Sequence, residues 1–399
     1  MKKRILILCE AIAPPAYSPR ILTLVKWLQR NGWECEIITE MDDDHILEWD
    51  TCPIHYMKTY RNLVADKLFG AKEIALYNYA CSVVDIASFD LIFCASYYYF
   101  PLQAARRLAK KYQIPLVIDL RDIAEQWGKL DYYTRSFTGI KSIDTIVKKI
   151  YTIINNHQRN RALHYATAVT TVSAWHQKVL SRWNKNTHLI YNGYDAETYY
   201  PSTKSSKTFN IVFIGKYYAH YERCPELLFA AIKKLIEANQ IDHTLIKISF
   251  YTNSIGQQAF ANLAKKYDIQ HIVSVYDYIP KQETLRVMHD SSILMILTIP
   301  FYINNTYGII GTKFYEILGM EKPCLCLQSD EECLAHIIEK TNAGLAATHV
   351  DEVKTFILEK YLEWTENGFT HQEVINKQQF TRQHAAQQFE RLFIETLKH

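Results

Sequence analysis

Short apolar runs of strand length alternate with amphipathic segments along most of this 399-residue chain. The runs of the first half are ILILCE (5–10), CEIIT (35–39), LIFCAS (91–96), PLVIDL (115–120), AVTTVS (168–173) and HLIYN (188–192). Helical patterns lie between most of them, as in PRILTLVKWLQRNG (19–32), whose apolar residues share one face before a terminal glycine. Continuous apolar strands separated by helices predict a parallel β-sheet covered on both faces.

A polar segment, YDAETYYPSTKSSKT (194–208), interrupts this alternation and predicts an interdomain linker. The runs then resume as NIVFIG (210–215), LIKISFYT (245–252), IVSVYDYI (272–279), ILMILT (293–298) and PCLCLQ (323–328). We therefore predict an α/β fold of two doubly wound Rossmann-like domains, over residues 1–200 and 207–369. Open parallel sheets bind ligands outside the carboxyl ends of their strands, so we expect function at a cleft that the two domains face.

The composition excludes several classes of protein. A net charge of +3 without a long Lys/Arg run does not suit nucleic-acid binding. Nine cysteines without a CxxC pair indicate a reducing compartment, and no apolar run approaches the ~20 residues of a membrane span. The apolar run of MKKRILILCEAIAPP leads into the α/β pattern, which favours a first core strand over a signal peptide. We expect a cytoplasmic protein.

The stretch GIIGTKFYEILGMEKP (308–323) combines the parts of a phosphate site. Gly308 and Gly311 allow close approach of a ligand, and we expect Thr312 to cap the helix that follows. The helix N-terminus and Lys313 favour a phosphate group, and Glu316, one turn on, suits a pair of ribose hydroxyls. An ordinary capped helix in which Glu316 pairs with a nearby lysine fits the same spacing.

A second candidate phosphate-binding segment is FNIVFIGKYYAHYERCPELLFAAIKKL (209–235). In it a predicted strand is followed by Lys216 and then by Arg223 near the start of a helix. This places two cations where a parallel sheet opens to ligands. Solvated loop charges are the alternative for both residues.

Taken together, these motifs resemble the GT-B glycosyltransferases, specifically the retaining family 4 type. The resemblance covers nearly the whole chain, through CEAIAPPAYSPRILTLVKWLQRNGWECEIIT, IPLVIDLRDIAEQW, AVTTVSAWHQKVL, IYNGYDAETYYP, FIGKYYAHYERCPELL and GTKFYEILGMEKP. It implies transfer of a sugar, with retention, from a nucleotide-diphosphate donor to a saccharide or lipid-linked acceptor. It also implies that the final helix, about 370–399, crosses back onto the N-terminal, acceptor-side domain.

The resemblance assigns roles to particular residues. It implies that the donor diphosphate is bound by Lys216, Arg223, Gly311, Thr312 and Lys313. Glu316 would bind the ribose, and the loop near Tyr278 and Ile279 would meet the nucleobase. Arg121 and Asp122, which end the DLRD strand, would face the donor sugar or the acceptor as the catalytic pair.

The sequence also departs from the family pattern. Gly308 stands where the family has the first of two glutamates, and the second basic residue is Arg223 where lysine is usual. The glycine pair after the first strand is replaced by Pro14, Pro15, Ser18 and Arg20. Reduced or lost activity is therefore open, as are two other functions: a sugar-nucleotide 2-epimerase of the same fold and a noncatalytic nucleotide-sugar-binding partner.

We expect no metal and no cofactor. The DDD of residues 42–44 has DxD spacing but falls in a predicted solvated loop, and HxxxH pairs and zinc-type Cys–His spacings are absent from the sequence. A GxGxxG motif follows neither leading strand, which disfavours a dehydrogenase. Lys216, Arg223, Lys313 and the helix N-terminus can stabilise a leaving diphosphate without a metal. The resemblance implies front-face attack, in which the leaving phosphate helps to deprotonate the acceptor, so we predict no enzymic nucleophile.

One helical segment raises the question of membrane contact. IKSIDTIVKKIYTIINN (140–156) places six β-branched residues on one face, namely Ile143, Ile146, Val147, Ile150, Ile153 and Ile154. Lys141, Lys148 and Lys149 lie beside that face, which would suit an anionic membrane surface and a peripheral protein. Packing on the N-terminal sheet is the alternative.

Overall fold

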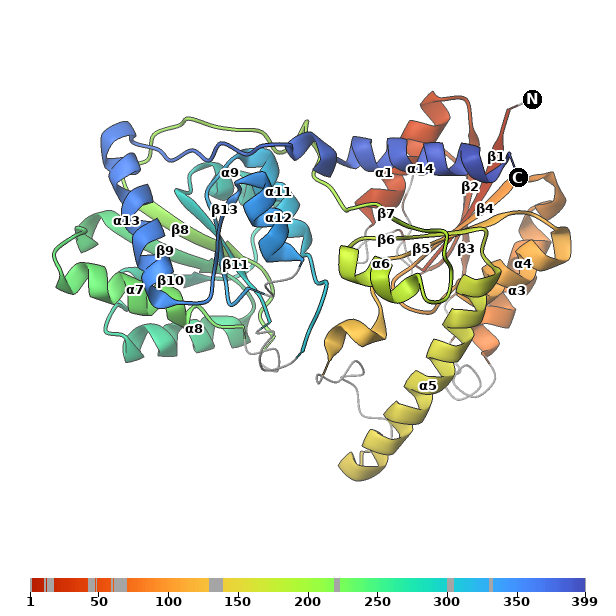
Figure 1. Ribbon diagram of the computed structural model, residues 1–399, viewed down its shortest axis with the longest axis horizontal. Coiled ribbons are helices and arrows are strands. Elements are labelled where there is room, and N and C mark those ends of the chain that lie inside the picture. Colours follow the sequence, from red (N-terminus) through yellow and green to blue (C-terminus); the bar gives the residue numbers. More distant parts are fainter. Residues whose placement is uncertain are drawn as a thin grey trace. The chain divides into compact units, whose positions relative to one another are not determined.

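The structure is a computed structural model that describes most of the chain. The described residues are 2–10, 12, 18–41, 47, 49–58, 60, 70–128, 139–218, 223–299, 305–329 and 333–398. They form two compact units, each with its own parallel sheet and helices (Figure 1). Unit 1 comprises residues 1–126, 131–193 and 382–399, and unit 2 comprises 127–130 and 194–381.

Unit 1 is built on a seven-stranded sheet in the order β3-β2-β1-β4-β5-β6-β7. Its strands are β1 Arg4–Cys9, β2 Glu34–Glu40, β3 Ile54–Met57, β4 Leu91–Ser96, β5 Leu116–Leu120, β6 Ala168–Thr171 and β7 Thr187–Leu189. Its α-helices are α1 Pro19–Arg30, α3 Ala71–Val83, α4 Leu102–Tyr112, α5 Lys141–Tyr165, α6 Ala174–Leu180 and α14 Arg382–Thr396. The strand order reverses direction between β1 and β4.

Unit 2 has a six-stranded sheet in the order β10-β9-β8-β11-β12-β13, which reverses direction between β8 and β11. Its strands are β8 Phe209–Ile214, β9 Ile246–Tyr251, β10 Val273–Tyr276, β11 Ile293–Leu297, β12 Cys324–Leu327 and β13 Gly344–Ala347. Its α-helices are α7 Glu226–Glu237, α8 Ser254–Lys266, α9 Lys281–His289, α11 Thr312–Met320, α12 Leu334–Thr341 and α13 Val350–Asn367. Both sheets pair in parallel throughout, which confirms the predicted fold class.

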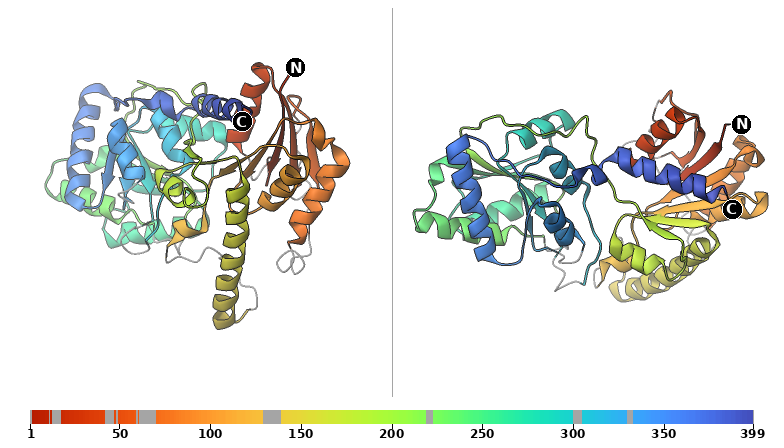
Figure 2. Two further views of the ribbon diagram at one scale, coloured as in Figure 1. Left: turned by 45° about the vertical axis from the view of Figure 1, so that its right-hand side comes forward. Right: turned by 45° about the horizontal axis from the view of Figure 1, so that its top comes forward.

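The apolar strands are continuous because helices cover both faces of each sheet. In β1, Leu6 and Leu8 pack into the cluster that includes α4, whereas Ile5 and Ile7 pack into the cluster that includes α1 and α14. All four side chains are fully buried. Helix α14 lies along α1 in unit 1 (Figure 2, right), and Phe389 reaches the ring of Phe93 on β4 with 5.3 Å between centroids.

A buried ion pair joins α1 to the sheet of unit 1. The guanidinium of Arg20 donates Nε and Nη2 to the two carboxylate oxygens of Asp119 on β5, each over 3.1 Å. Arg20 also donates to the backbone oxygens of Ile190 and Tyr191, and Thr170 Oγ1 on β6 donates to Asp119 over 2.7 Å. Arg20, one of the four residues found where the family has its glycine pair, therefore organises the packing of α1, β5 and β6.

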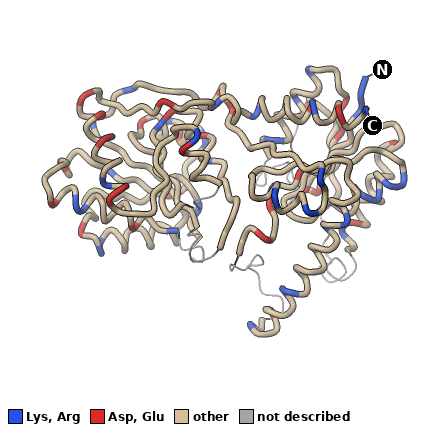
Figure 3. The backbone as a smooth tube through the Cα atoms, in the orientation of Figure 1, with Lys and Arg blue, Asp and Glu red and all other residues tan. Residues whose placement is uncertain are grey.

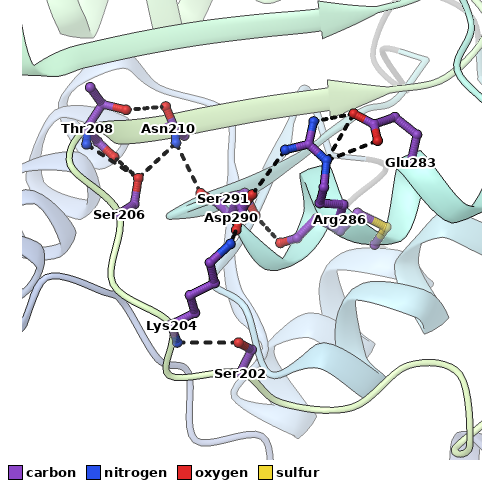
Figure 4. Close-up of polar contacts among 10 residues, drawn as sticks. Ser202, Lys204, Ser206, Thr208, Asn210, Glu283, Arg286, Asp290 and Ser291 are labelled. Atoms are coloured by element: carbon purple, nitrogen blue, oxygen red, sulfur yellow. Dashed lines mark hydrogen bonds and ion pairs between the residues drawn. The ribbon is translucent and has the colours of Figure 1, made fainter.

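The polar stretch that follows unit 1 is held to unit 2 by its side chains (Figure 4). Lys204 pairs with Asp290 at the end of α9 over 2.7 Å, and the Asn210 amide donates to the Asp290 backbone oxygen and to Ser206 Oγ. These contacts fix the course of the chain as it enters β8.

Candidate functional site

A cavity of about 200 Å³ opens in unit 2 where the strand order reverses. Phe213 to Lys216, at the end of β8, line one side of it, and Leu297 to Ile299, at the end of β11, line another. The start of α11 completes the wall. Such a switch point is where open parallel sheets bind ligands. Five residues predicted from the sequence to bind the diphosphate line this one cavity: Lys216, Arg223, Gly311, Thr312 and Lys313.

Two of the predicted cations converge on one aromatic ring. The ammonium of Lys216 lies 5.0 Å from the ring centroid of Tyr218, and the guanidinium carbon of Arg223 lies 5.9 Å from it. These are distances at which a cation is attracted to the ring face. Tyr218 thus helps to hold both charges at the cavity, although Lys216 itself is exposed to solvent and available to an anion.

The N-terminus of α11 supplies backbone amides. The N-cap is Gly311, and no side chain caps the helix. The expectation that Thr312 caps it is wrong, because Thr312 is the first helical residue and its own amide is one of the groups that a cap would satisfy. A Cβ on Gly311 would meet nothing within 4 Å, so the backbone is open at this point. An uncapped helix start beside cations suits an anion such as a diphosphate.

Glu316 lies on the same helix and contacts Lys313. Lys313 Nζ donates to Glu316 Oε2 over 2.7 Å, and the Glu316 side chain is only 12% exposed. The pairing that the sequence left open as an alternative is therefore present in the structure. It holds a shielded carboxylate within one helical turn of the cavity wall.

The backbone conformation explains why glycine, and not the family's first glutamate, stands at position 308. Gly308 is buried and has φ +68°, a left-handed conformation that costs glycine little and other residues more. A glutamate at this position would have to adopt that strained backbone. The loop therefore presents main chain, rather than a carboxylate, ahead of Gly311.

The predicted nucleobase loop follows β10 in unit 2. Tyr278 follows β10 and is 54% exposed, and Ile279 beside it is half-buried. Burial, and after it the neighbouring Tyr218, raises the pKa of the Tyr278 hydroxyl. Neither Tyr278 nor Ile279 is among the described residues that line the cavity, and neither is Glu316. Tyr218 thus contacts both cavity cations and also acts on the hydroxyl of Tyr278.

The predicted catalytic pair lies in unit 1, directly after β5. Arg121 Nη1 donates to Ser18 Oγ over 3.0 Å, and its guanidinium stacks on the Tyr97 ring at 3.9 Å. Asp122 accepts from Gln126 Nε2 over 3.0 Å, and its amide donates to the Tyr97 carbonyl. Burial raises the pKa of Asp122, partly offset by Gln126 and Arg121. Arg121 is thus bonded to Ser18 and stacked on Tyr97, and Asp122 is bonded to Gln126.

Thr306 and Tyr218 are among the residues of the unit 2 cavity region that the sequence missed. Thr306 is buried and lines the cavity, and Tyr218 contacts both cations. The sequence contained a pattern that could have identified Tyr218, because this residue follows the Gly-Lys pair at a strand end. No local sequence pattern identifies Thr306, since it lies in an irregular segment whose course is not set by its own residues.

A metal centre has no support among the side chains whose positions the structure gives. No group of three or more His, Cys, Asp or Glu able to hold a metal occurs among them. Asp42 to Asp44, with the DxD spacing, lie outside the described residues, as do Pro14 and Pro15. None of the nine cysteines, all of which are described, forms a disulfide, and Cys324 and Cys326 of β12 are buried.

Comparison with known proteins agrees with this geometry. Residues 19–198 match the family model Glycosyltransferase Family 4, which agrees with the resemblance drawn from the motifs for this part of the chain. No curated protein sequence matches the chain.

Solved structures of the same fold cover nearly the whole chain. Sucrose-phosphate synthase from Thermosynechococcus elongatus is 13% identical, with a TM-score of 0.63 over 98% of this chain and 99% of its own. HepE of Anabaena, in complex with UDP and glucose, is 13% identical, with a TM-score of 0.61 over 98% and 100%. The lipopolysaccharide outer core galactosyltransferase WaaB is 12% identical, with a TM-score of 0.63 over 98% and 99%. The chain has the GT-B fold.

Proposed function

We propose that this protein is a glycosyltransferase that moves a sugar from a nucleoside-diphosphate donor to a saccharide or lipid-linked acceptor. The observation that carries the proposal is the cavity at the β8–β11 switch point, where Lys216, Arg223 and the uncapped start of α11 come together. Cations and free helical amides together suit a diphosphate that gains negative charge as it leaves. HepE, a structure of the same fold, is in complex with UDP, which makes UDP the first nucleotide to test.

The proposed chemistry is transfer with retention and without a metal. Lys216, Arg223 and Lys313 neutralise the leaving diphosphate, and the leaving phosphate itself accepts the acceptor's proton. Glu316 binds the ribose, and the loop of Tyr278 and Ile279 meets the base. We assign Arg121 and Asp122 to orienting a sugar hydroxyl, since a buried carboxylate next to a fixed guanidinium is a directional acceptor.

A direct experiment separates this function from its two alternatives. A thermal-shift panel of UDP, GDP, ADP, CDP and dTDP identifies the nucleotide, because a ligand that binds only the native state raises its stability. Sugar nucleotides of the best base are then incubated with and without acceptor glycans. A transferase releases nucleoside diphosphate only when acceptor is present, a 2-epimerase converts its sugar nucleotide without acceptor, and a noncatalytic partner binds without turnover.

Replacement of Glu316 by alanine is expected to remove recognition of the ribose hydroxyls. Hydrogen bonds to a charged group contribute about 1.5–3 kcal/mol, so the Kd of the preferred nucleoside diphosphate should rise about 10- to 100-fold. Wild type should also prefer the ribonucleotide over its 2′-deoxy analogue, and the Glu316→Ala variant should not. Isothermal titration of both nucleotides measures the two effects together.

The matched control for this variant is Glu339→Ala, which removes an exposed glutamate from α12 in the same unit. Its nucleotide affinity should equal that of wild type. A Glu316→Ala protein that keeps the full preference for the ribonucleotide would show that Glu316 only holds Lys313.

We also propose that α5 docks the protein on an anionic membrane surface. Its isoleucines stay exposed, with Ile146 at 61% and Ile153 at 68%, where a helix packed on the sheet would bury them. The helix carries five Lys or Arg and one Asp. Its N-terminal part extends away from the sheet of unit 1 (Figure 2, left), and Lys and Arg recur along it (Figure 3). In the described part of the chain, every helix is too short or too polar to span a bilayer. Peripheral attachment on the cytoplasmic face fits a lipid-linked acceptor.

Reversing two charges on α5 tests this proposal. Each lysine near an anionic surface contributes about 1 kcal/mol, so Lys148→Glu with Lys149→Glu should lower binding to vesicles at least about tenfold. Sedimentation with phosphatidylglycerol–phosphatidylcholine vesicles measures it. Lys110→Glu with Lys111→Glu, the same change on exposed α4 residues of unit 1, is the control. Unchanged sedimentation of the α5 variant, or a dimer in solution that α5 substitutions abolish, would reject membrane docking.

A further inference from the structure

The short segment that follows β8 in unit 2 is fixed by backbone hydrogen bonds on both sides of Lys216. The amide of Gly215 donates to the carbonyl of Tyr251, at the end of β9, over 3.1 Å. The amide of Tyr217 donates to Asn253 Oδ1 over 2.9 Å. With both neighbours held, the backbone of Lys216 has little freedom, and its side chain is presented to the cavity from a rigid base.

Tyr217 anchors the same segment through its ring. The ring meets that of Phe260 on α8 edge-on, with 5.1 Å between centroids, and Phe260 is fully buried in the core of unit 2. Gly256, one turn earlier on α8, makes room for this contact, because a Cβ there would lie only 2.6 Å from the Cβ of Tyr217. The core of the unit therefore determines where the next residue, Tyr218, is placed.

The ring of Tyr218 is shared by two like charges. The ammonium of Lys216 lies 5.0 Å from its centroid, and the guanidinium carbon of Arg223 lies 5.9 Å from it. Like charges repel each other, and no carboxylate in the part of the chain that the structure describes forms an ion pair with Lys216. The negative face of an aromatic ring offsets part of that repulsion.

A ring suits this place better than a carboxylate does. A carboxylate would hold two cations as well, but its full negative charge would compete with an incoming phosphate. The ring has no net charge, so it attracts the cations and leaves their charge available to a ligand. Lys216 is exposed to solvent while it contacts the ring, so a phosphate reaches its ammonium without displacing Tyr218.

We propose that Tyr218 is a positioning residue that holds Lys216 and Arg223 where two phosphates need them, so that the site selects a diphosphate over a monophosphate. The inference rests on the proposed transferase function and adds how the two charges are kept in place before the donor arrives. Tyr218 acts through the cations and touches neither donor nor acceptor in this role.

Three ligands that differ in phosphate number test the proposal on the full chain. They are the preferred nucleoside diphosphate, its monophosphate and the free nucleoside, each measured by isothermal titration. Tyr218→Leu keeps an apolar side chain but removes the ring, and it should weaken diphosphate binding about 5- to 20-fold, because both cation–π contacts are lost. Monophosphate binding should weaken about 2- to 4-fold, and nucleoside binding should not change. Tyr218→Phe, which keeps the ring face, should bind all three ligands as wild type does.

A merely structural role of Tyr218 predicts a different pattern, in which all three ligands weaken together. Tyr200→Leu is the control, at a tyrosine of unit 2 that is 54% exposed and lies outside the cavity, and it should change none of the three affinities. Kinetics give a second readout. Because the leaving phosphate gains charge during transfer, kcat should fall in Tyr218→Leu in addition to the rise in KM.

Three results overturn the inference: equal weakening of all three ligands, a Tyr218→Phe protein as weak as Tyr218→Leu, or a Tyr218→Leu protein that binds the diphosphate at least as tightly as wild type. In each of them wild type still binds the diphosphate, so the proposed transferase function stands. A wild type that binds no nucleoside diphosphate overturns that function and, with it, the role of Tyr218.

Discussion

Lys216→Ala is expected to lower kcat/KM for the sugar nucleotide by about 10²–10³-fold, the usual cost of removing one donor aimed at developing charge. Lys216 lines the unit 2 cavity and is exposed, so its ammonium is free to meet the β-phosphate. Because that phosphate gains charge as the glycosidic bond breaks, the loss should fall mainly on kcat. Initial rates of nucleotide release in the presence of acceptor measure it.

Two comparisons make this prediction specific. Binding of the nucleoside diphosphate should weaken in Lys216→Ala, whereas binding of the free nucleoside, which has no phosphate, should not. Lys234→Ala removes a lysine of α7 whose only described partner in an ion pair is the exposed Asp351, and such surface pairs contribute little. If the Lys216→Ala enzyme is as active as the Lys234→Ala enzyme, the assignment of the diphosphate to this cavity is wrong.

The parallel sheets could be predicted because their strands carry their own signal. A strand covered on both faces reads as an apolar run, and β1, β4, β11 and β12 do so apart from a polar residue at one end of β1 and of β4. β5 and β8 each carry a single polar residue within such a run, Asp119 and Asn210. The edge strands β3 and β13 were missed. β3, IHYM, is mostly half-buried, and β13, GLAA, has small side chains; both form because the neighbouring strand offers hydrogen bonds, which the local sequence does not show.

The cavity of unit 2 was partly predictable for a similar reason. Glycine and lysine directly after a strand, and glycine before a helix, are local patterns, and Lys216, Gly311 and Lys313 were found through them. What the sequence does not show is that β8 and β11 are neighbours. That adjacency depends on the order of the whole sheet, and it is what brings Thr306 to the same wall as Lys216.

The anchoring of Tyr217 after β8 was missed for the same reason. Gly256 and Phe260, which pack against Tyr217, lie on α8, well beyond it in the chain, and no local pattern pairs them with it. The exposed face of α5 was visible as a periodic pattern, but a pattern cannot say whether a sheet covers it. Only the exposed fractions of Ile146 and Ile153 decide between core and surface.

Asp119→Ala is expected to lower the free energy of unfolding by about 3–5 kcal/mol, the cost of leaving a buried charge without its partner. Asp119 is fully buried, and both of its oxygens receive bonds from Arg20. Without Asp119 the Arg20 guanidinium loses its carboxylate partner. Its remaining described hydrogen bonds of 3.0 Å or less go to the backbone oxygens of Ile190 and Tyr191. Denaturant unfolding followed by tryptophan fluorescence reports this loss, since most tryptophans of the chain lie in unit 1.

The size of the loss should depend on the charge left behind rather than on the pair itself. Replacing both residues together, as Arg20→Met with Asp119→Leu, removes the buried charge and should recover much of the stability, because apolar residues of similar volume often substitute for a buried ion pair. Arg182→Ala, at an exposed arginine of unit 1, should shift the unfolding midpoint little. If Asp119→Ala behaves like Arg182→Ala, or if the double variant is less stable than Asp119→Ala, the pair does not organise α1 and β5 in the way described.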